Sequence, residues 1–315
     1  MFRRTLISAL LLTAASPAFA EDLLEVYGLA VDNDPQIKAA QATRDAAVEA
    51  VPQATSGLLP KVNVSASYSK KSQDVLQTFP GVSTGTIIGD DRNTSVSIRQ
   101  PLLNLNAIAA RKAAKANASR ADLQFKLAQQ DLVLRTAEAY FNVLAKKENL
   151  NFARAEKNAI ERQLEQTKQR FDVGLVAVTA VHEAQARYDQ SVAQEIASEN
   201  ELAIAREQLS EITGQSHKSL TQLKAQTPLV PPTPTNMQEW TDTARDNNLN
   251  VQMAEQSVTA AEETVAARKA NRYPTLDATG SYSYFLNQSS ITQESTTAAV
   301  GLELSMNLYQ GGFIS

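Results

Sequence analysis

Cysteine is absent from the 315 residues of this chain, and histidine occurs only as His182 and His217. Without cysteine there are no disulfides, no thiol catalysis and no thiolate metal sites. No Ser/His/Asp set, metal-ligand spacing or phosphate-binding loop accompanies the two histidines, so we expect no enzyme, no catalytic residue, no metal and no cofactor. The formal net charge of -4 is small and gives no reason to expect a nucleic acid partner.

Long apolar runs are also missing. No stretch after Ala20 reaches the roughly eighteen consecutive apolar residues of a membrane-spanning helix, so any membrane crossing must use strands. Residues 1–20 fit a secretory signal peptide, with Arg3 and Arg4 ahead of the short apolar segment LISALLLTAA and an A-x-A pattern that ends at Ala20. We therefore predict cleavage between Ala20 and Glu21 and export of the mature chain.

Glycine and proline are absent from residues 102–173, a run of about seventy residues. A helix of that length would extend for roughly 100 Å at ~1.5 Å per residue. Residues 175–213 form a second such run, and Gly174 lies between the two. Both runs repeat a three-four spacing that is typical of a coiled coil, at Leu150, Ala153, Lys157, Ile160, Leu164, Thr167 and Phe171 and at Val178, Val181, Gln185, Tyr188 and Val192. We predict an antiparallel helical hairpin over residues 104–214, with its tip at residues 171–177.

The sequence is an internal duplication. Tyr68 aligns with Tyr282 and Pro60 with Pro274, both at an offset of 214 residues, and the order of the predicted elements is the same in both copies.

Each copy begins with a predicted helix, over residues 21–57 and 238–272. The first helix is interrupted at residues 33–35 and the second at residues 247–248, where Asn, Asp and Pro favour a break and a new cap. Pro52 should kink the first helix or end it early.

Segments that alternate apolar and polar residues follow these helices, two within residues 58–103 and two within residues 273–309. Each has about ten residues, which suits a tilted strand across a bilayer, and their Ser-, Asn- and Thr-rich faces suit a wet lumen. A half-buried soluble sheet is the alternative for any single strand. Four strands are too few to close a barrel and lipid does not tolerate open edges, so membrane strands predict an oligomer. Charged candidates for the lumen are Arg99, Asp277 and Glu303.

A proline-rich connector is expected to join the copies over residues 215–237 and to lie exposed. The long helix of the second copy should begin at residues 310–315. Roughly a hundred residues of that copy are missing by comparison with the first. We therefore expect a C-terminally truncated chain that does not form a sealed tunnel alone.

The chain resembles the TolC family of trimeric outer-membrane efflux proteins from Asp22 onwards. The resemblance is carried by residues 139–144 (AYFNVL), 169–177 (QRFDVGLVA), 309–312 (YQGG), 58–60 (LLP) and 273–276 (YPTL). It implies a mainly α fold with transmembrane β: long helical hairpins that form an α-barrel tunnel in the periplasm, and four strands per protomer in the twelve-stranded outer-membrane barrel of a homotrimer.

The resemblance also implies an exit duct for efflux of small molecules or type I protein secretion, without chemistry. Its partners would be outer-membrane lipid, a periplasmic adaptor and an inner-membrane pump of RND, ABC or MFS type. The adaptor would dock at the hairpin turn, here Arg170, Phe171, Val173, Gly174 and Leu175. Gly174 is also suited to a plain helix C-cap.

Ala180 departs from the family pattern, in which an acid after the turn helps to close the entrance. The gating residues therefore stay unassigned; His182 is a candidate substitute, or simply an exposed histidine. The alternative functions are a periplasmic adaptor and a trimeric adhesin stalk, although the duplication and the four membrane-length strands favour the channel. The sequence does not identify the substrate, the pump or the adaptor.

Overall fold

The computed structural model describes residues 21–75, 85–223, 231, 233–287, 294–309 and 311. The predicted signal peptide with Ala20, residues 224–230 and 232 of the proline-rich connector, and residues 310 and 312–315 lie outside the described residues. The chain divides into two compact units. The hairpin unit contains Met1–Ala39 and Ala128–Thr233, and the sheet unit contains Ala40–Leu127 and Pro234–Ser315.

The hairpin unit begins with helix α1, Leu23–Asn33. A capping box starts this helix: the Asp22 carboxylate accepts a hydrogen bond from the Glu25 N–H, and the Glu25 carboxylate accepts one from the Asp22 N–H. α1 lies against helix α4, Val178–Thr213, and buries Val26 completely.

The break predicted at residues 33–35 is confirmed. α1 ends at Asn33, and helix α2, Pro35–Thr55, begins two residues later. Asp34 lies between the two helices, and its carboxylate accepts a hydrogen bond from the Gln36 N–H at 3.3 Å. One residue therefore ends the first helix and caps the second.

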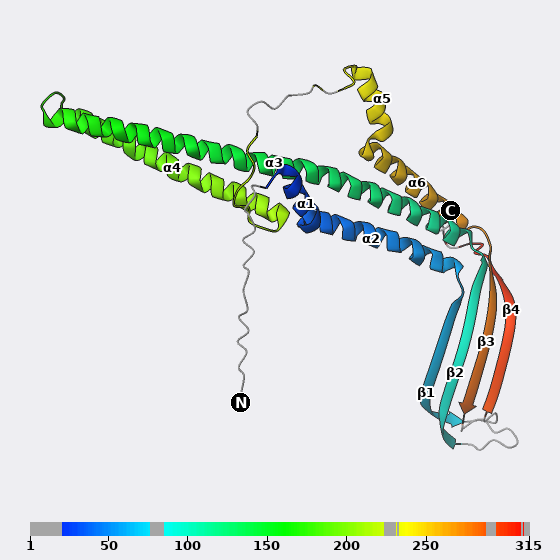
Figure 1. The fold of residues 1–315 in the computed structure, drawn as a ribbon. Helices are drawn as coiled ribbons and strands as arrows, with labels where there is room; N and C mark the ends of the chain where they lie inside the picture. Colours follow the sequence, from blue (N-terminus) through cyan, green and yellow to red (C-terminus); the bar gives the residue numbers. More distant parts are fainter. Residues whose placement is uncertain are drawn as a thin grey trace, which may run out of the picture. The chain divides into compact units, whose positions relative to one another are not determined.

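Helix α3, Leu105–Asp172, is continuous over 68 residues; its first part belongs to the sheet unit and the rest to the hairpin unit. In the hairpin unit α3 and α4 lie side by side as an antiparallel hairpin (Figure 1). The predicted seam is confirmed at Leu150, Ala153 and Leu164, which are buried, whereas Phe171 at its end is 41% exposed. The core of this unit comprises Val26, Tyr140, Val143, Leu144, Leu150, Leu202, Ala205, Leu209 and Leu220.

The sheet unit contains an antiparallel sheet of four strands in the order β1-β2-β3-β4 (Figure 1). The strands are β1, Lys61–Val75; β2, Gly85–Leu103; β3, Thr275–Asn287; and β4, Glu294–Ser305. Their pairing is regular except for a register shift between Pro101 and Leu103. β1 and β4 are the edges, so within the described part of the chain each has no strand on its outer side.

The remaining helices of the sheet unit are the rest of α2, the short 3₁₀ helix Ser56–Leu58, α5, Met237–Asn247, and α6, Leu249–Ala270. The Asn106 amide joins the start of α3 to the end of α6, donating to the Ala267 carbonyl at 2.9 Å and to the Asn271 side chain at 2.8 Å. Small side chains are buried along the same part of α3, at Ala107, Ala109, Ala113 and Ala116. Of the helices that the structure describes, none has the length and apolar character needed to cross a membrane.

Two details of the sequence prediction are wrong, and one of two alternatives is excluded. The strands have 15, 19, 13 and 12 residues rather than about ten, mainly because residues 70–75 and 85–90 pair as a ribbon although their side chains no longer alternate. The last strand is predicted from an alternation of apolar and polar residues at Val300, Leu302, Leu304, Met306 and Leu308. β4 begins earlier, at Glu294, and ends before Met306 and Leu308. Of the two alternatives expected at Pro52, an early end is excluded, since α2 continues to Thr55. The missing N–H of one proline removes only one helical hydrogen bond.

Candidate functional site

The two faces of the sheet differ in chemistry, because alternate residues of a strand point to opposite sides. One face carries exposed apolar side chains: Val62, Val64, Tyr68, Val96, Ile98, Tyr282, Tyr284, Val300, Leu302 and Leu304. The first charges on this face, counted from the helix end of the described strands, occur in the paired row Tyr68, Arg92, Leu286 and Glu294. We call the part before that row the apolar band.

The opposite, polar face brings together the three charged residues that the sequence suggested for a lumen. Asp277 and Glu303 are direct cross-strand neighbours on β3 and β4. Arg99 of β2 donates one guanidinium N–H to each of these two carboxylates, both at 3.2 Å. The Asp277 side chain is 14% exposed and the Glu303 side chain 51%. One cation therefore bridges two like charges that would otherwise repel each other.

The hairpin tip is a glycine turn with exposed apolar side chains. Gly174 has a φ of 76°, in the left-handed region that favours glycine. Its N–H donates to the Phe171 carbonyl and the Leu175 N–H donates to the Arg170 carbonyl, both at 2.8 Å, which closes the end of α3. Gly174 is therefore a helix C-cap, as its position allowed. Val173 and Leu175 are 70% and 69% exposed.

A slot of about 270 Å³ lies between α3 and α4 beside the tip. Ala180 lines this slot together with Arg170 and Arg187. His182 is exposed and is not part of its lining.

The sequence analysis did not predict a cluster of three charged residues in the hairpin seam, Arg154, Lys157 and Glu195. The Lys157 ammonium lies 2.8 Å from Oε2 of Glu195 on α4, and Arg154 donates to Oε1 of the same carboxylate at 3.1 Å. The hydrogen bond from Lys157, helped by the one from Arg154, lowers the pKa of Glu195, and it raises the pKa of Lys157. The available signal was a lysine at a seam position, which implies an acidic neighbour on the facing helix.

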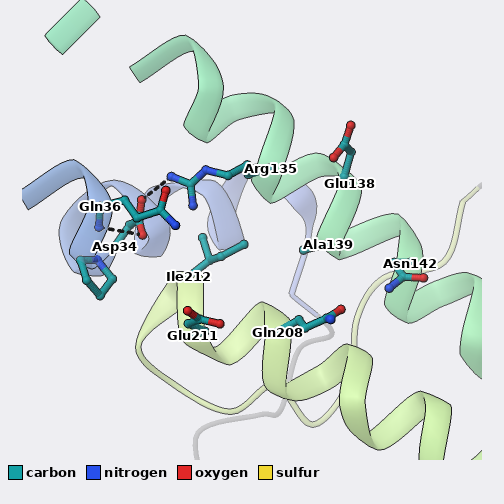
Figure 2. Close-up of a pocket in the computed structure, with 10 residues that line it drawn as sticks. Asp34, Gln36, Arg135, Glu138, Ala139, Asn142, Gln208, Glu211 and Ile212 are labelled. Atoms are coloured by element: carbon teal, nitrogen blue, oxygen red, sulfur yellow. Dashed lines mark hydrogen bonds and ion pairs between the residues drawn. The ribbon is translucent and has the colours of Figure 1, made fainter. Parts of the chain in front are cut away.

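A polar pocket of about 420 Å³ lies among Asp34, the start of α2, α3 and α4 of the hairpin unit (Figure 2). Asp34 is 2% exposed there, and Arg135 donates to it at 2.6 Å and to Asp131 at 2.8 Å. Burial opposes the charge of Arg135, but the two carboxylates outweigh burial and raise its pKa. Glu138 and Glu211 also line the pocket. The sequence identified Asp34 as a cap but not its partner, because Arg135 is 101 residues away.

Glu21, the first residue after the predicted cleavage site, is fixed by several interactions. Its N–H donates to the Ser219 carbonyl at 3.2 Å, and its carbonyl accepts from the Thr221 N–H at 3.0 Å. Its carboxylate contacts Nδ1 of His217, whose side chain is 1% exposed and whose Nε2 lies 2.7 Å from the Thr213 hydroxyl. His217 therefore belongs to a structural network. Within the described ranges, no group of three or more His, Asp or Glu side chains is arranged to hold a metal ion.

Comparison with known proteins identifies the family. The family described as outer membrane efflux protein matches residues 26–215 and 240–314. The chain is 37% identical to outer membrane protein TolC of Vibrio cholerae, over 97% of this chain and 69% of that protein. It is 28% identical to the alkaline protease secretion protein AprF of Pseudomonas aeruginosa, over 98% of this chain and 65% of that protein.

The fold is shared with a solved channel. The crystal structure of the Campylobacter jejuni CmeC outer membrane channel superimposes with a TM-score of 0.78 at 18% identity, over 93% of this chain and 62% of that one. The chain spans between 60% and 69% of the length of the relatives it matches. These findings confirm the resemblance and the outer-membrane location predicted from the sequence. The chain belongs to the outer membrane efflux protein family.

Proposed function

We propose that the chain forms the outer-membrane part of an exit duct, through which small molecules or proteins of a type I secretion system leave the cell without chemical change. The two-faced sheet carries this proposal. Its apolar band holds no charge, has Tyr284 in its last row and is followed by Tyr68 in the next row, as in strands that cross a membrane, while its other face is polar. The family description, outer membrane efflux protein, supports efflux, and the name of the alkaline protease secretion protein supports protein secretion. No observation favours a periplasmic adaptor or an adhesin stalk instead.

The free edges of the sheet support assembly with further copies of the chain. An open edge is not tolerated in lipid, and four strands are fewer than the eight or so of the smallest barrels. We therefore propose a homotrimer that pools its strands into a twelve-stranded barrel.

Engineered cysteines test the membrane topology sharply, because the chain has none of its own. Val64 and Ser65 are adjacent on β1 and point to opposite faces, and Val300 and Gly301 are the matching pair on β4. In isolated outer membranes, a small charged maleimide should label Ser65→Cys and Gly301→Cys but not Val64→Cys or Val300→Cys. After denaturation all four variants should react equally. Equal labelling of both faces in intact membranes would contradict the proposal.

We further propose that the mature chain, cleaved between Ala20 and Glu21, works with a periplasmic adaptor and an inner-membrane pump of RND, ABC or MFS type. The exposed apolar tip, Arg170 with Phe171, Val173, Gly174 and Leu175, supports adaptor docking, because exposed apolar groups on a rigid turn offer a preformed contact.

Charge placed in the tip tests this docking. Leu175→Asp should reduce co-purification of the adaptor while the oligomer remains intact. Asn158→Asp, which adds the same charge to an exposed position of α3, is the control. Equal recovery of adaptor with both variants would remove the tip from the proposal.

A further inference from the structure

The charges on the polar face of the sheet lie in two groups, one at each end of the described strands. The group next to the helices comprises Lys61, Arg99, Asp277 and Glu303, and the group at the other end comprises Lys71 and Asp91. Between the groups, the described polar face carries only uncharged side chains, mostly Ser, Thr and Asn. Cations and anions are equal in number in each group, so both ends of the polar face are electrically balanced.

Arg99 is the residue on which the balance of the larger group depends. It lies on β2, directly opposite Lys61 on β1. Its guanidinium is the group that touches both Asp277 and Glu303, and it is 52% exposed, so it faces water rather than the interior of the protein. Removing it would leave two facing carboxylates in contact with water and without a bridging cation.

We propose that Arg99 determines the ion selectivity of the duct, because it keeps the helix-proximal end of the polar face neutral. This inference rests on the proposed function, since it needs the polar face to line a water-filled passage. In a homotrimer the group occurs three times around that passage. A ring in which carboxylates outnumber cations on the wall of an aqueous passage attracts cations and repels anions. With Arg99 in place the duct accepts solutes of either sign.

Reversal potentials across planar bilayers measure this selectivity directly. Channels formed by the full chain should be weakly selective in a KCl gradient. Arg99→Gln should raise the ratio of K⁺ to Cl⁻ permeability severalfold. The double variant Asp277→Asn/Glu303→Gln, which removes the repelling pair and therefore does not strain the sheet, should shift the ratio toward Cl⁻. Combining all three substitutions leaves Lys61 as the one charge of this group, so the ratio should lie between those of the double variant and the unchanged chain.

Two comparisons separate a local electrostatic effect from a structural one. Arg99→Lys should retain the original ratio, and Lys70→Gln, which removes one charge from the opposite face of β1, should do the same. The shifts should shrink at 1 M salt, where the Debye length falls to ~3 Å from ~10 Å at 0.1 M.

The possible failures are distinguishable. Open channels whose permeability ratio is unchanged in both Arg99→Gln and Asp277→Asn/Glu303→Gln would overturn the role of Arg99 and leave the duct standing. Absence of any conductance from the unchanged chain would overturn both the duct and the inference built on it.

Discussion

A helix is interrupted at Asp34 in the first copy and at Asn248 in the second. The backbone hydrogen bonds are the same at both breaks, but the first break is buried and the second is exposed. Each N–H donates to the carbonyl four residues earlier, Ala30 at 2.9 Å and Ala244 at 2.8 Å, and each side chain caps the next helix. Asp34 is 2% exposed and paired with Arg135, whereas Asn248 is exposed and neutral. A local rule therefore fixes the break, and the packing around it decides whether that break carries a charge.

The helices before the two breaks differ in the same way. α1 buries Val26 completely against the hairpin, whereas no residue of α5 is buried and its Met237 is 82% exposed. The first break is thus part of a packed core, and the second lies on a surface of the described chain. Substitutions at the first break should lower the free energy of unfolding strongly, and equivalent substitutions at the second break should change it little.

Arg135→Met should produce the largest loss of stability. It leaves the Asp34 carboxylate buried without its cation, and breaking a buried pair in this way costs about 3–5 kcal/mol. Denaturant unfolding followed by circular dichroism would measure the change in the free energy of unfolding. Arg162→Met, at an exposed position of the same helix, should change stability by less than about 0.5 kcal/mol.

Replacing Asp34 with asparagine, the residue type at the second break, should restore the stability of this variant. Asn caps a helix about as well as Asp and carries no charge, so Arg135→Met/Asp34→Asn should regain much of the lost stability. A double variant as unstable as Arg135→Met alone would show that the unpaired charge is not the cause.

The core around the first break is the next most sensitive feature. Leu209 is fully buried against α1, and Leu209→Ala should cost about 3 kcal/mol through lost transfer energy and the cavity left behind. Met237→Ala in α5 is the matched truncation on the exposed side and should cost less than about 0.5 kcal/mol. Similar losses in both variants would mean that α5 is covered in the assembled protein.

The local part of this architecture is predictable from the sequence. Gly- and Pro-free runs define α3 and α4, a glycine between them defines the tip, and the breaks follow from Asn, Asp and Pro at residues 33–35 and 247–248. These features depend on backbone preferences of neighbouring residues. The strand lengths were not predictable, because residues 70–75 and 85–90 pair through their backbones without the side-chain alternation that the prediction uses.

The candidate site was predictable only in part, for a related reason. Alternation placed Arg99, Asp277 and Glu303 on polar faces, but their contact depends on the register of three strands. The partners of Asp34 and Glu21 are equally remote: Arg135 is 101 residues away and His217 is 196 residues away. No local pattern encodes such pairs, although a charge at a position expected to be buried signals that a partner exists.

Glycine substitutions sharpen the comparison further. Gly214 ends α4 with a φ of 73°, and a Cβ there would lie 3.0 Å from Cβ of Asn33, the last residue before the first break. Gly214→Ala should therefore cost about 1–2 kcal/mol for the left-handed backbone alone. Gly28→Ala, inside α1 with no atom within 4 Å of its new Cβ, should instead stabilise the protein by about 0.5–1 kcal/mol. Thermal unfolding of the two variants should shift in opposite directions.

Asn248→Asp, which places the first copy's residue in the second break, should have the smallest effect. The carboxylate would cap α6 as Asn248 does now and would favour its positive N-terminal end, but it would also lie at the negative C-terminal end of α5 and near Asp246. These effects oppose each other, so the change should be within about 0.5 kcal/mol. The Gln252 N–H donates to the Asn248 carbonyl at 3.1 Å, so its hydrogen-exchange rate would measure the local change in helix stability. A large loss of protection would mean that the second break, like the first, needs a cation to hold a carboxylate.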